Sequence, residues 1–248
     1  MAPHRRHLRL TVLLLATMAA RRTLAHCELL AISPGAASSV DELKVACSAL
    51  AEAGCRRLLL REPGLSSVQV EQLVEALLPL YPPDGLILHE KCAGARAIAM
   101  EHGLGLHLKS TSNWGAERSH WSGALGASAH SIEELQRAAE LGLNWAFFSP
   151  VARPTSKPGD LRPPIGEAAV VEAQEMFPSL TVYALGGISV DSAVRLAAGG
   201  ARGIAVLGGI FSSGSSTSPS EAATAVRQYL QALDTDLGTL VDASLCND

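Results

Sequence analysis

The chain has 248 residues, of which 48% are hydrophobic and 18% are charged, so it can bury a sizeable core in one large α/β domain or two small ones. The net charge of −4 and the pI near 6.1 argue against a nucleic-acid-binding surface, because phosphate backbones attract basic patches. The five cysteines form no CxxC pair and no cluster with zinc-ligand spacing, which predicts reduced, mostly structural thiols.

The N-terminal stretch "RRHLRLTVLLLATMAARR" is basic, then apolar from Leu10 to Ala20, then basic again. The apolar run is too short to span a bilayer and resembles the hydrophobic part of a signal peptide. Arg21 and Arg22, however, stand where a cleavage site should lie. We therefore expect residues 1–27 to be an N-terminal extension that is disordered or cleaved, and we expect a cytoplasmic protein with no membrane partner.

Short apolar runs recur along the rest of the chain and predict eight strands. They are nearly continuous rather than alternating, as in parallel strands that are covered on both faces. In chain order they are Leu29–Ser33, Arg56–Arg61, Gly85–His89, Gly105–Leu108, Ala124–Ala129, Trp145–Ser149, Thr181–Leu185 and Gly203–Leu207.

Amphipathic segments with helix caps lie between these runs. Two of them are Val40–Ala53 and Val68–Leu80, preceded by Ser39 and Ser67; further helices begin after Ser131, after Ser189, and after Ser218 or Ser220. Alternating strands and helices predict a single (β/α)8 TIM barrel over residues 28–234, followed by a C-terminal tail, 235–248. The alternative is a doubly wound open sheet, but its glycine fingerprint is missing after the first strand. Residues 113–123 show no clear helix.

Two glycine pairs follow the last two predicted strands, where a barrel of this kind builds its active site. Gly186–Gly187 and Gly208–Gly209 each stand between a strand and a helix. Without Cβ atoms the backbone can approach an anion, which the N–H groups of a helix start can hold. The pairs therefore predict a phosphate site; the alternative is that they only relieve crowding between strand and helix.

Other candidate residues follow the remaining strands. His130 ends the fifth strand, and its imidazole is suited to moving protons at neutral pH, although it could simply begin the next helix. His107 lies inside a strand run and is expected to be packed and hydrogen-bonded. Arg61 and Glu62 could form a functional pair or a structural ion pair. The stretch "FFSPVARPTSKPG" runs from a strand into a loop that is either an ordinary turn or an anion-binding loop.

These segments together resemble the thiamine-phosphate synthase/TenI family. The resemblance covers about Leu29 to Leu233 and includes "LLLREP" and "LILHEK"; it is most specific over Gly126–Gly159 and Tyr183–Phe211. It implies a TIM barrel. Synthases of this family join a thiazole phosphate to an aminopyrimidine diphosphate with magnesium and release pyrophosphate, whereas some TenI relatives tautomerise a thiazole carboxylate phosphate.

The match to the synthase motifs is partial. Arg61 matches the arginine of the synthase's "QLREK", but Leu59 and Pro63 replace its glutamine and lysine. Glu90 could still offer a carboxylate to magnesium, whereas Ser112 stands in place of the metal-binding aspartate and cannot supply a charged oxygen.

The resemblance also assigns the remaining site residues. In the pyrophosphate loop, Ser156 and Lys157 are retained and one hydroxyl is lost. Ser128 and His130 match an "S-x-H" motif, in which TenI-type tautomerases use the histidine as acid and base. The two glycine pairs match the thiazole-phosphate site.

This pattern favours a TenI-like enzyme of thiamine metabolism that binds a phosphorylated thiazole. It implies no definite cofactor, and magnesium only if synthase activity is retained. His130 would move a proton on the ring, Gly187, Gly208 and Gly209 would hold the phosphate, and Arg61 and Lys157 would complement the remaining charge. One alternative is a thiamine-phosphate synthase that binds magnesium through Glu90. Another is a catalytically idle barrel that binds a phosphorylated ligand and regulates or scaffolds. A homo-oligomer is compatible with each alternative.

Overall fold

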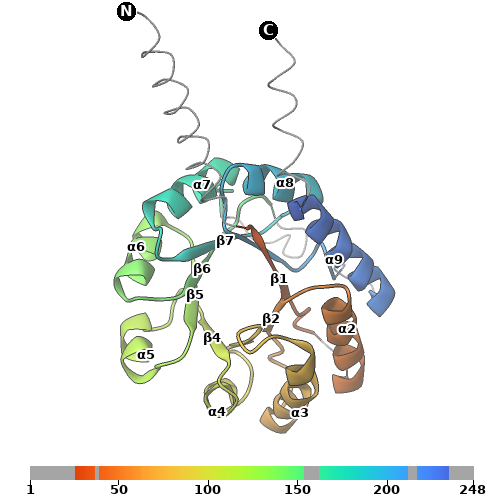
Figure 1. Cartoon of the computed structure of the whole chain (residues 1–248). Coiled ribbons are helices and arrows are strands. Elements are labelled where there is room, and N and C mark those ends of the chain that lie inside the picture. The colour runs from red at the N-terminus through yellow and green to blue at the C-terminus, as the bar shows by residue number, and fades with distance from the viewer. Residues whose placement is uncertain (1–25, 37–38, 154–161, 212–216, 235–248) are drawn as a thin grey trace, which may run out of the picture.

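A computed structural model of the chain describes residues 26–36, 39–153, 162–211 and 217–234. Eight parallel strands close into a barrel in chain order, and the last strand pairs with the first (Figure 1). They are β1 (Glu28–Ile32), β2 (Arg57–Leu60), β3 (Leu86–His89), β4 (Gly105–Leu108), β5 (Leu125–Ala129), β6 (Trp145–Phe148), β7 (Thr181–Leu185) and β8 (Gly203–Val206). The predicted TIM barrel and all eight predicted strands are confirmed.

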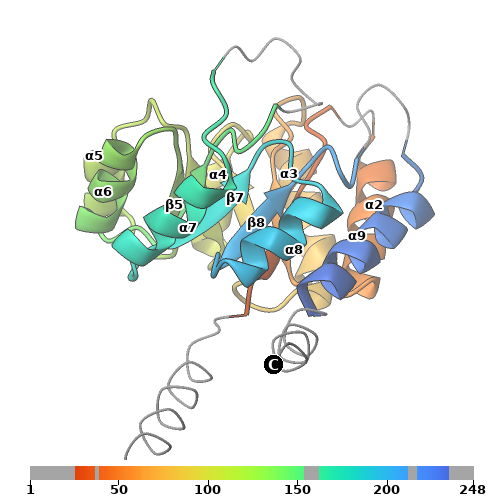
Figure 2. The same ribbon diagram turned by 90° about the horizontal axis from the view of Figure 1, so that it is seen from above.

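Helices surround the barrel (Figure 2). They are α2 (Val40–Glu52), α3 (Ser67–Leu77), the 3-10 turn η1 (Leu78–Leu80), α4 (Ala95–Glu101), α5 (Trp114–His120), α6 (Ile132–Glu140), α7 (Glu167–Met176), α8 (Val190–Ala198) and α9 (Pro219–Asp234). Sequence patterns predicted α2, α3, α6, α8 and α9, but not α4, α5 or α7.

Serine side chains cap most of the predicted helices. Ser39, Ser131 and Ser189 each accept a hydrogen bond from the backbone N–H three residues further on, as predicted. The prediction for α3 was wrong by one residue, because Ser66 is the cap and forms a reciprocal capping box with Gln69. For α9, Ser218 is the cap: its Oγ accepts from the Glu221 N–H at 3.3 Å.

The continuous apolar pattern of the strands has a direct structural cause. Side chains that point outward pack under the helices in one large core, and those that point inward fill the barrel. The inner cluster consists of Leu30, Ile32, Leu59, Ile87, Trp145, Phe147, Tyr183 and Ala205. Because both faces of each strand are buried, no polar alternation is needed.

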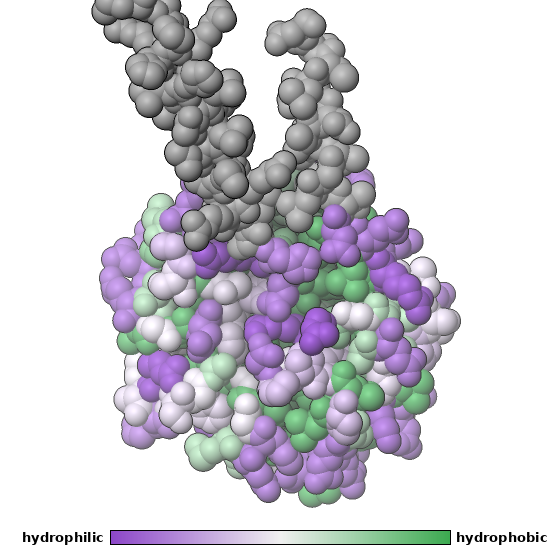
Figure 3. All heavy atoms as spheres, in the orientation of Figure 1, coloured by the Kyte–Doolittle hydropathy of each residue, from purple (hydrophilic) through white to green (hydrophobic). Residues whose placement is uncertain are grey.

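One end of the barrel is closed by a polar cluster. Arg57 lies 3.0 Å from Glu28 and 2.8 Å from Asp84, and it donates to the Tyr183 hydroxyl at 3.3 Å. These groups lie near the starts of the strands, so the opposite end, where the strands finish, is left for a binding site. The space-filling view in Figure 3 shows small hydrophobic areas scattered among hydrophilic ones.

The described cysteines, Cys27, Cys47, Cys55 and Cys92, are buried free thiols, in agreement with the prediction of structural cysteines. Among the described helices, none is long and apolar enough to cross a membrane. The predicted tail 235–248, Cys246, and all but the last two residues of the predicted extension 1–27 lie outside the described residues.

Candidate active site

A cavity of about 270 Å³ lies where the strands end. Four of the predicted site residues, Arg61, Ser128, His130 and Gly186, line it. Its apolar wall comes from residues at or just after the ends of the strands. The remaining lining residues are Ile32, Leu59, His89, Lys91, His107, Lys109, Ser110, Phe147, Ser149, Pro150, Arg162, Leu185 and Leu207. Segments far apart in the sequence thus meet in one concave site, which is the usual form of a ligand pocket.

A second pocket, of about 340 Å³, adjoins the first. Both predicted glycine pairs line it, and it shares Leu185, Gly186 and Leu207 with the main cavity. Arg153 and the start of α8 at Ser189 also contribute to its wall. An anion in this second pocket would meet glycine backbone, a helix N-terminus and a guanidinium.

The first glycine pair has a conformation that only glycine adopts readily. Gly186 and Gly187 have φ values of 98° and 68°, in the left-handed region. A Cβ on Gly187 would lie 2.8 Å from the Cβ of Ala152, so the β7 turn also needs glycine to approach the loop after β6. The sequence suggested two roles for the glycine pairs, binding of a phosphate and relief of crowding. At Gly187 one backbone conformation can serve both roles.

The main cavity is strongly basic. Arg61, Lys91, Lys109 and Arg162 line it, whereas no aspartate or glutamate is found among the described lining residues. Glu62, the neighbour of Arg61, is buried elsewhere and accepts a hydrogen bond from the Gly35 N–H at 2.8 Å. Such a cavity attracts an anionic ligand.

Two groups contact the imidazole nitrogens of His130. Nδ1 lies 2.9 Å from the carbonyl oxygen of Ser149, and since a carbonyl only accepts, this contact favours a proton on Nδ1 and leaves Nε2 as the acceptor. Nη1 of Arg162, which only donates, lies 2.6 Å from Nδ1 and 2.7 Å from Nε2. Its contact with Nδ1 favours the opposite tautomer. The backbone N–H of His130 donates to Glu134 at 2.6 Å, which fixes the residue at the start of α6.

His107 is packed and hydrogen-bonded, as its position inside a strand predicted. Its side chain is fully buried, stacks on Phe147 with 4.1 Å between ring centroids, and contacts both Trp145 and Ser128 at 3.0 Å. Burial, with a smaller contribution from the neighbouring His89, holds the pKa of His107 well below its ordinary value. The ring is therefore neutral at physiological pH.

Magnesium does not fit the residues present at the predicted metal position. Glu90 Oε1 accepts hydrogen bonds from the Ser112 hydroxyl at 2.6 Å and the Lys109 N–H at 2.8 Å. The Lys109 ammonium lies 3.5 Å from the same oxygen, and Arg96 lies 3.9 Å from Oε2. Burial raises the pKa of Glu90, but these hydrogen bonds and the Lys109 charge more than offset it and leave the pKa lowered. The carboxylate is already neutralised by protein groups, and its expected partner ligand is a serine.

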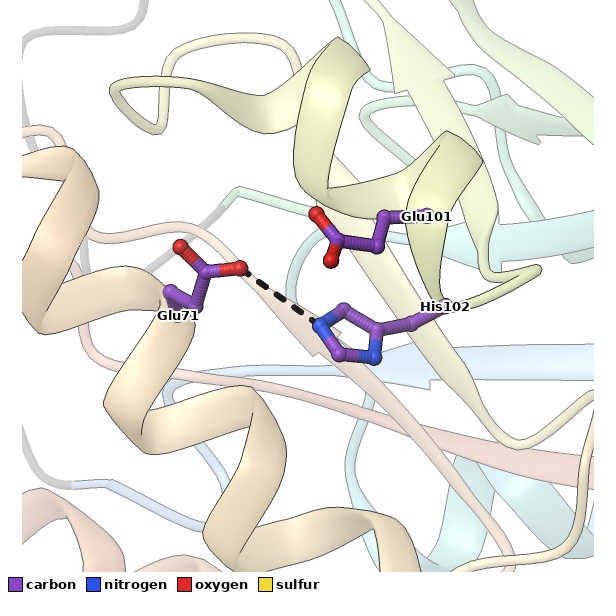
Figure 4. A group of neighbouring side chains, drawn as sticks. All are labelled: Glu71, Glu101 and His102. Carbon is purple, nitrogen blue, oxygen red and sulfur yellow. Dashed lines mark ion pairs between the residues drawn. The ribbon is translucent and has the colours of Figure 1, made fainter.

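Metal-ligand spacing does occur elsewhere in the described part of the chain. Glu71 on α3, with Glu101 and His102 at the end of α4, places three ligand atoms within 4.8 Å of one another. His102 Nε2 lies 3.6 Å from Glu71 Oε1 (Figure 4). This cluster belongs to the outer helices and contributes no side chain to either pocket, so it cannot serve a ligand there.

His89 makes the stability of the fold depend on pH. Burial, and then the charge of Arg61, lowers the pKa of His89 to about 4. An unfolded histidine has a pKa of about 6.5, so between these values the unfolded chain binds more protons and stability falls as pH falls. We expect His89 to cost about 2 kcal/mol of unfolding free energy between about pH 7 and pH 5. Urea melts of the wild type and His89→Asn test this, because the variant should show a smaller loss than the exposed control His120→Asn.

Several residues of the site could not be located from sequence patterns. Lys91, Lys109, Arg153 and Arg162 are basic residues whose place in the pockets depends on loop conformation; the only signal is that Lys91 and Lys109 closely follow strands. Among the predicted residues, Ser156 and Lys157 lie outside the described residues. Glu90 is next to the main cavity but does not line it.

Comparisons with known proteins identify the family of this chain. A family described as thiamine monophosphate synthase matches residues 29–210. A thiamine-phosphate synthase of Herpetosiphon aurantiacus is 31% identical over 181 residues, covering 71% of this chain and 82% of that protein. One of Thioalkalivibrio sulfidiphilus is 29% identical over 189 residues, covering 74% and 87%.

Solved structures show the same fold. A thiamine phosphate pyrophosphorylase from Pyrococcus furiosus superposes with a TM-score of 0.66 at 16% identity, covering 87% of this chain and 99% of that one. A second, from Bacteroides thetaiotaomicron, has a TM-score of 0.59 at 22% identity and covers 84% and 98%. From the sequence match and the shared barrel together, the chain belongs to the thiamine monophosphate synthase (TMP-TENI) family.

Proposed function

We propose that this protein is a TenI-like enzyme that moves a proton on the ring of a thiazole phosphate. The observation that carries the proposal is the position of His130: its imidazole lines a basic cavity beside the glycine-lined pocket. A thiazole phosphate would place its phosphate on Gly186–Gly187 and Gly208–Gly209. Its ring would then extend into the main cavity.

In this proposal His130 is both the base and the acid. Nε2 accepts a proton from one ring atom, and the imidazolium returns a proton to another, so the substrate is isomerised without a change in composition. The Ser149 carbonyl, 2.9 Å from Nδ1, supports the tautomer in which Nε2 is the acceptor. Arg162 gives up its contacts with both ring nitrogens when the ligand enters and, with Arg61, stabilises negative charge that develops on the ligand.

The synthase reaction is the second candidate, because curated relatives of this chain carry that name. It needs a magnesium ion to bind the diphosphate, and the Glu90 environment disfavours one. Lys109 and Arg96 already neutralise Glu90, and Ser112 donates to it rather than offering a charged oxygen. The idle-barrel alternative requires that His130 serve no chemical purpose.

Isomerisation without metal tests the proposal. Purified protein treated with EDTA is incubated with a thiazole carboxylate phosphate, and the two ring isomers are followed by proton NMR. We expect conversion at a rate that EDTA does not change. Ligand binding without conversion would contradict the proposal and favour the idle barrel.

Magnesium should not bind the folded protein at Glu90. A ligand that binds only the native state raises the melting temperature, and the rise grows with its concentration relative to Kd. We expect millimolar MgCl2 to leave the wild-type melting temperature unchanged. The double variant K109G/S112D, which removes the ammonium and restores a second carboxylate, should be stabilised by the same salt. A magnesium-dependent rise in the wild type that Glu90→Gln abolishes would contradict this expectation.

A further inference from the structure

Three side chains form a hydrogen-bond chain that ends in the main cavity. Trp145 Nε1 lies 3.0 Å from His107 Nδ1, and His107 Nε2 lies 3.0 Å from Ser128 Oγ. Trp145 and His107 are 3% and 0% exposed, so neither side chain has an alternative partner in bulk water. Ser128 lines the cavity, on the strand that leads to His130.

The donor and acceptor roles in these hydrogen bonds follow from Trp145. An indole N–H can only donate, so His107 Nδ1 must accept and carries no proton. The ring is buried between Phe147 and Trp145 and is neutral, so its single proton is on Nε2. Nε2 therefore donates to Ser128 Oγ. The Ser128 hydroxyl already accepts one hydrogen bond from behind, and its own proton is available in the cavity.

We propose that His107 is a positioning residue that holds the Ser128 hydroxyl as a hydrogen-bond donor to an acceptor atom of the ligand. This assignment rests on the proposed function only in taking the main cavity as the ligand site. Ser128 cannot be a nucleophile activated by His107, because neither nitrogen of the imidazole is left to take its proton. Ser128 and His130 then have opposite roles: one donates to the ligand, and the other accepts from it.

The tautomer of His107 can be measured without any ligand. In nitrogen-15 NMR of the wild-type protein, long-range couplings distinguish a ring protonated on Nε2 from one protonated on Nδ1. We expect His107 to carry its proton on Nε2. A His107 ring protonated on Nδ1 would overturn the proposal, whatever the protein does with a thiazole phosphate.

Binding measurements test the consequence for the ligand. Ser128→Ala should weaken thiazole-phosphate binding about tenfold, as expected for the loss of one hydrogen bond to a charged or strongly polar acceptor. Trp145→Phe frees His107 Nδ1, so the ring proton can move there and Ser128 can donate to Nε2 instead. This substitution should weaken binding severalfold, although Trp145 does not line the cavity.

The two substitutions should not act independently. If Trp145 works through Ser128, the double variant should bind as weakly as Ser128→Ala alone. Multiplicative losses would overturn the proposal. Trp121→Phe is the matched control, since it removes a buried indole that donates to the Ala124 carbonyl at 3.1 Å, outside the cavity. Thermal melts show whether Trp145→Phe remains folded. If the wild type does not bind a thiazole phosphate, the proposed function fails, while the NMR result still decides the role of His107.

Discussion

Substitution of His130 by alanine is expected to lower kcat for thiazole isomerisation by about 10²–10⁴-fold, the range for loss of a general acid–base. The reason is geometric. The His130 imidazole lines the basic cavity beside the glycine-lined pocket, where it can exchange a proton with the ring of a bound ligand. Binding of the phosphate end, which we propose to lie in the glycine-lined pocket, should change little. Proton NMR of the isomers and calorimetric titration of the ligand measure the two effects separately.

His120→Ala provides the control for this prediction. His120 is exposed at the end of α5 and lines neither pocket, so its removal should leave both kcat and Kd unchanged. If His130→Ala kept full isomerase activity, another group would have to move the proton. If it abolished binding as well as turnover, His130 would serve to hold the ligand rather than to exchange a proton with it.

The second large effect is expected at the β7 turn, where Gly187→Ala should weaken phosphate-ligand binding by roughly 10–100-fold, as for lost hydrogen bonds to a charged group. A Cβ at this position would lie 2.8 Å from the Ala152 Cβ and 3.0 Å from the Arg153 carbonyl oxygen. The turn or the loop after β6 must therefore move, and both line the glycine pocket. The φ of 68° adds a strain of about 1–2 kcal/mol for a residue with a Cβ.

Gly142→Ala separates strain from binding. Gly142 has a nearly equal φ of 65°, but a Cβ there would meet nothing within 4 Å. It follows α6 and lines neither pocket, so its substitution should lower stability without changing ligand affinity. Equal losses of affinity in the two variants, measured by calorimetry, would show that the glycine-lined pocket does not bind the phosphate.

Burial explains why the strands could be predicted so completely. Each strand is buried on both faces, against the barrel interior and under the helices, so its sequence is one continuous apolar run. The missed helices lack comparable signals. α4 and α7 begin at Gly94 and Gly166 without a side-chain cap, and α5 buries only Trp114 among its described residues.

The sequence could predict those candidate site residues that lie at the end of a strand or directly after it. His130, Ser128 and the glycine pairs directly follow or end strands, and the closed barrel brings these positions together. The environment of Glu90 was harder to predict from the sequence. Ser112 could be read as a lost metal ligand, but its hydrogen bond to Glu90 and the approach of Lys109 depend on how two loops pack against each other.

The proposed reaction is a proton exchange between this barrel and a thiazole phosphate, not the joining of that phosphate to a pyrimidine. One assay decides between these reactions: the protein is mixed with a thiazole carboxylate phosphate, an aminopyrimidine diphosphate and magnesium, and ring isomers and pyrophosphate are followed together by proton and phosphorus NMR. We expect isomer conversion with no release of pyrophosphate. Enzyme-dependent pyrophosphate release, with thiamine phosphate formed in equal amount, would contradict it.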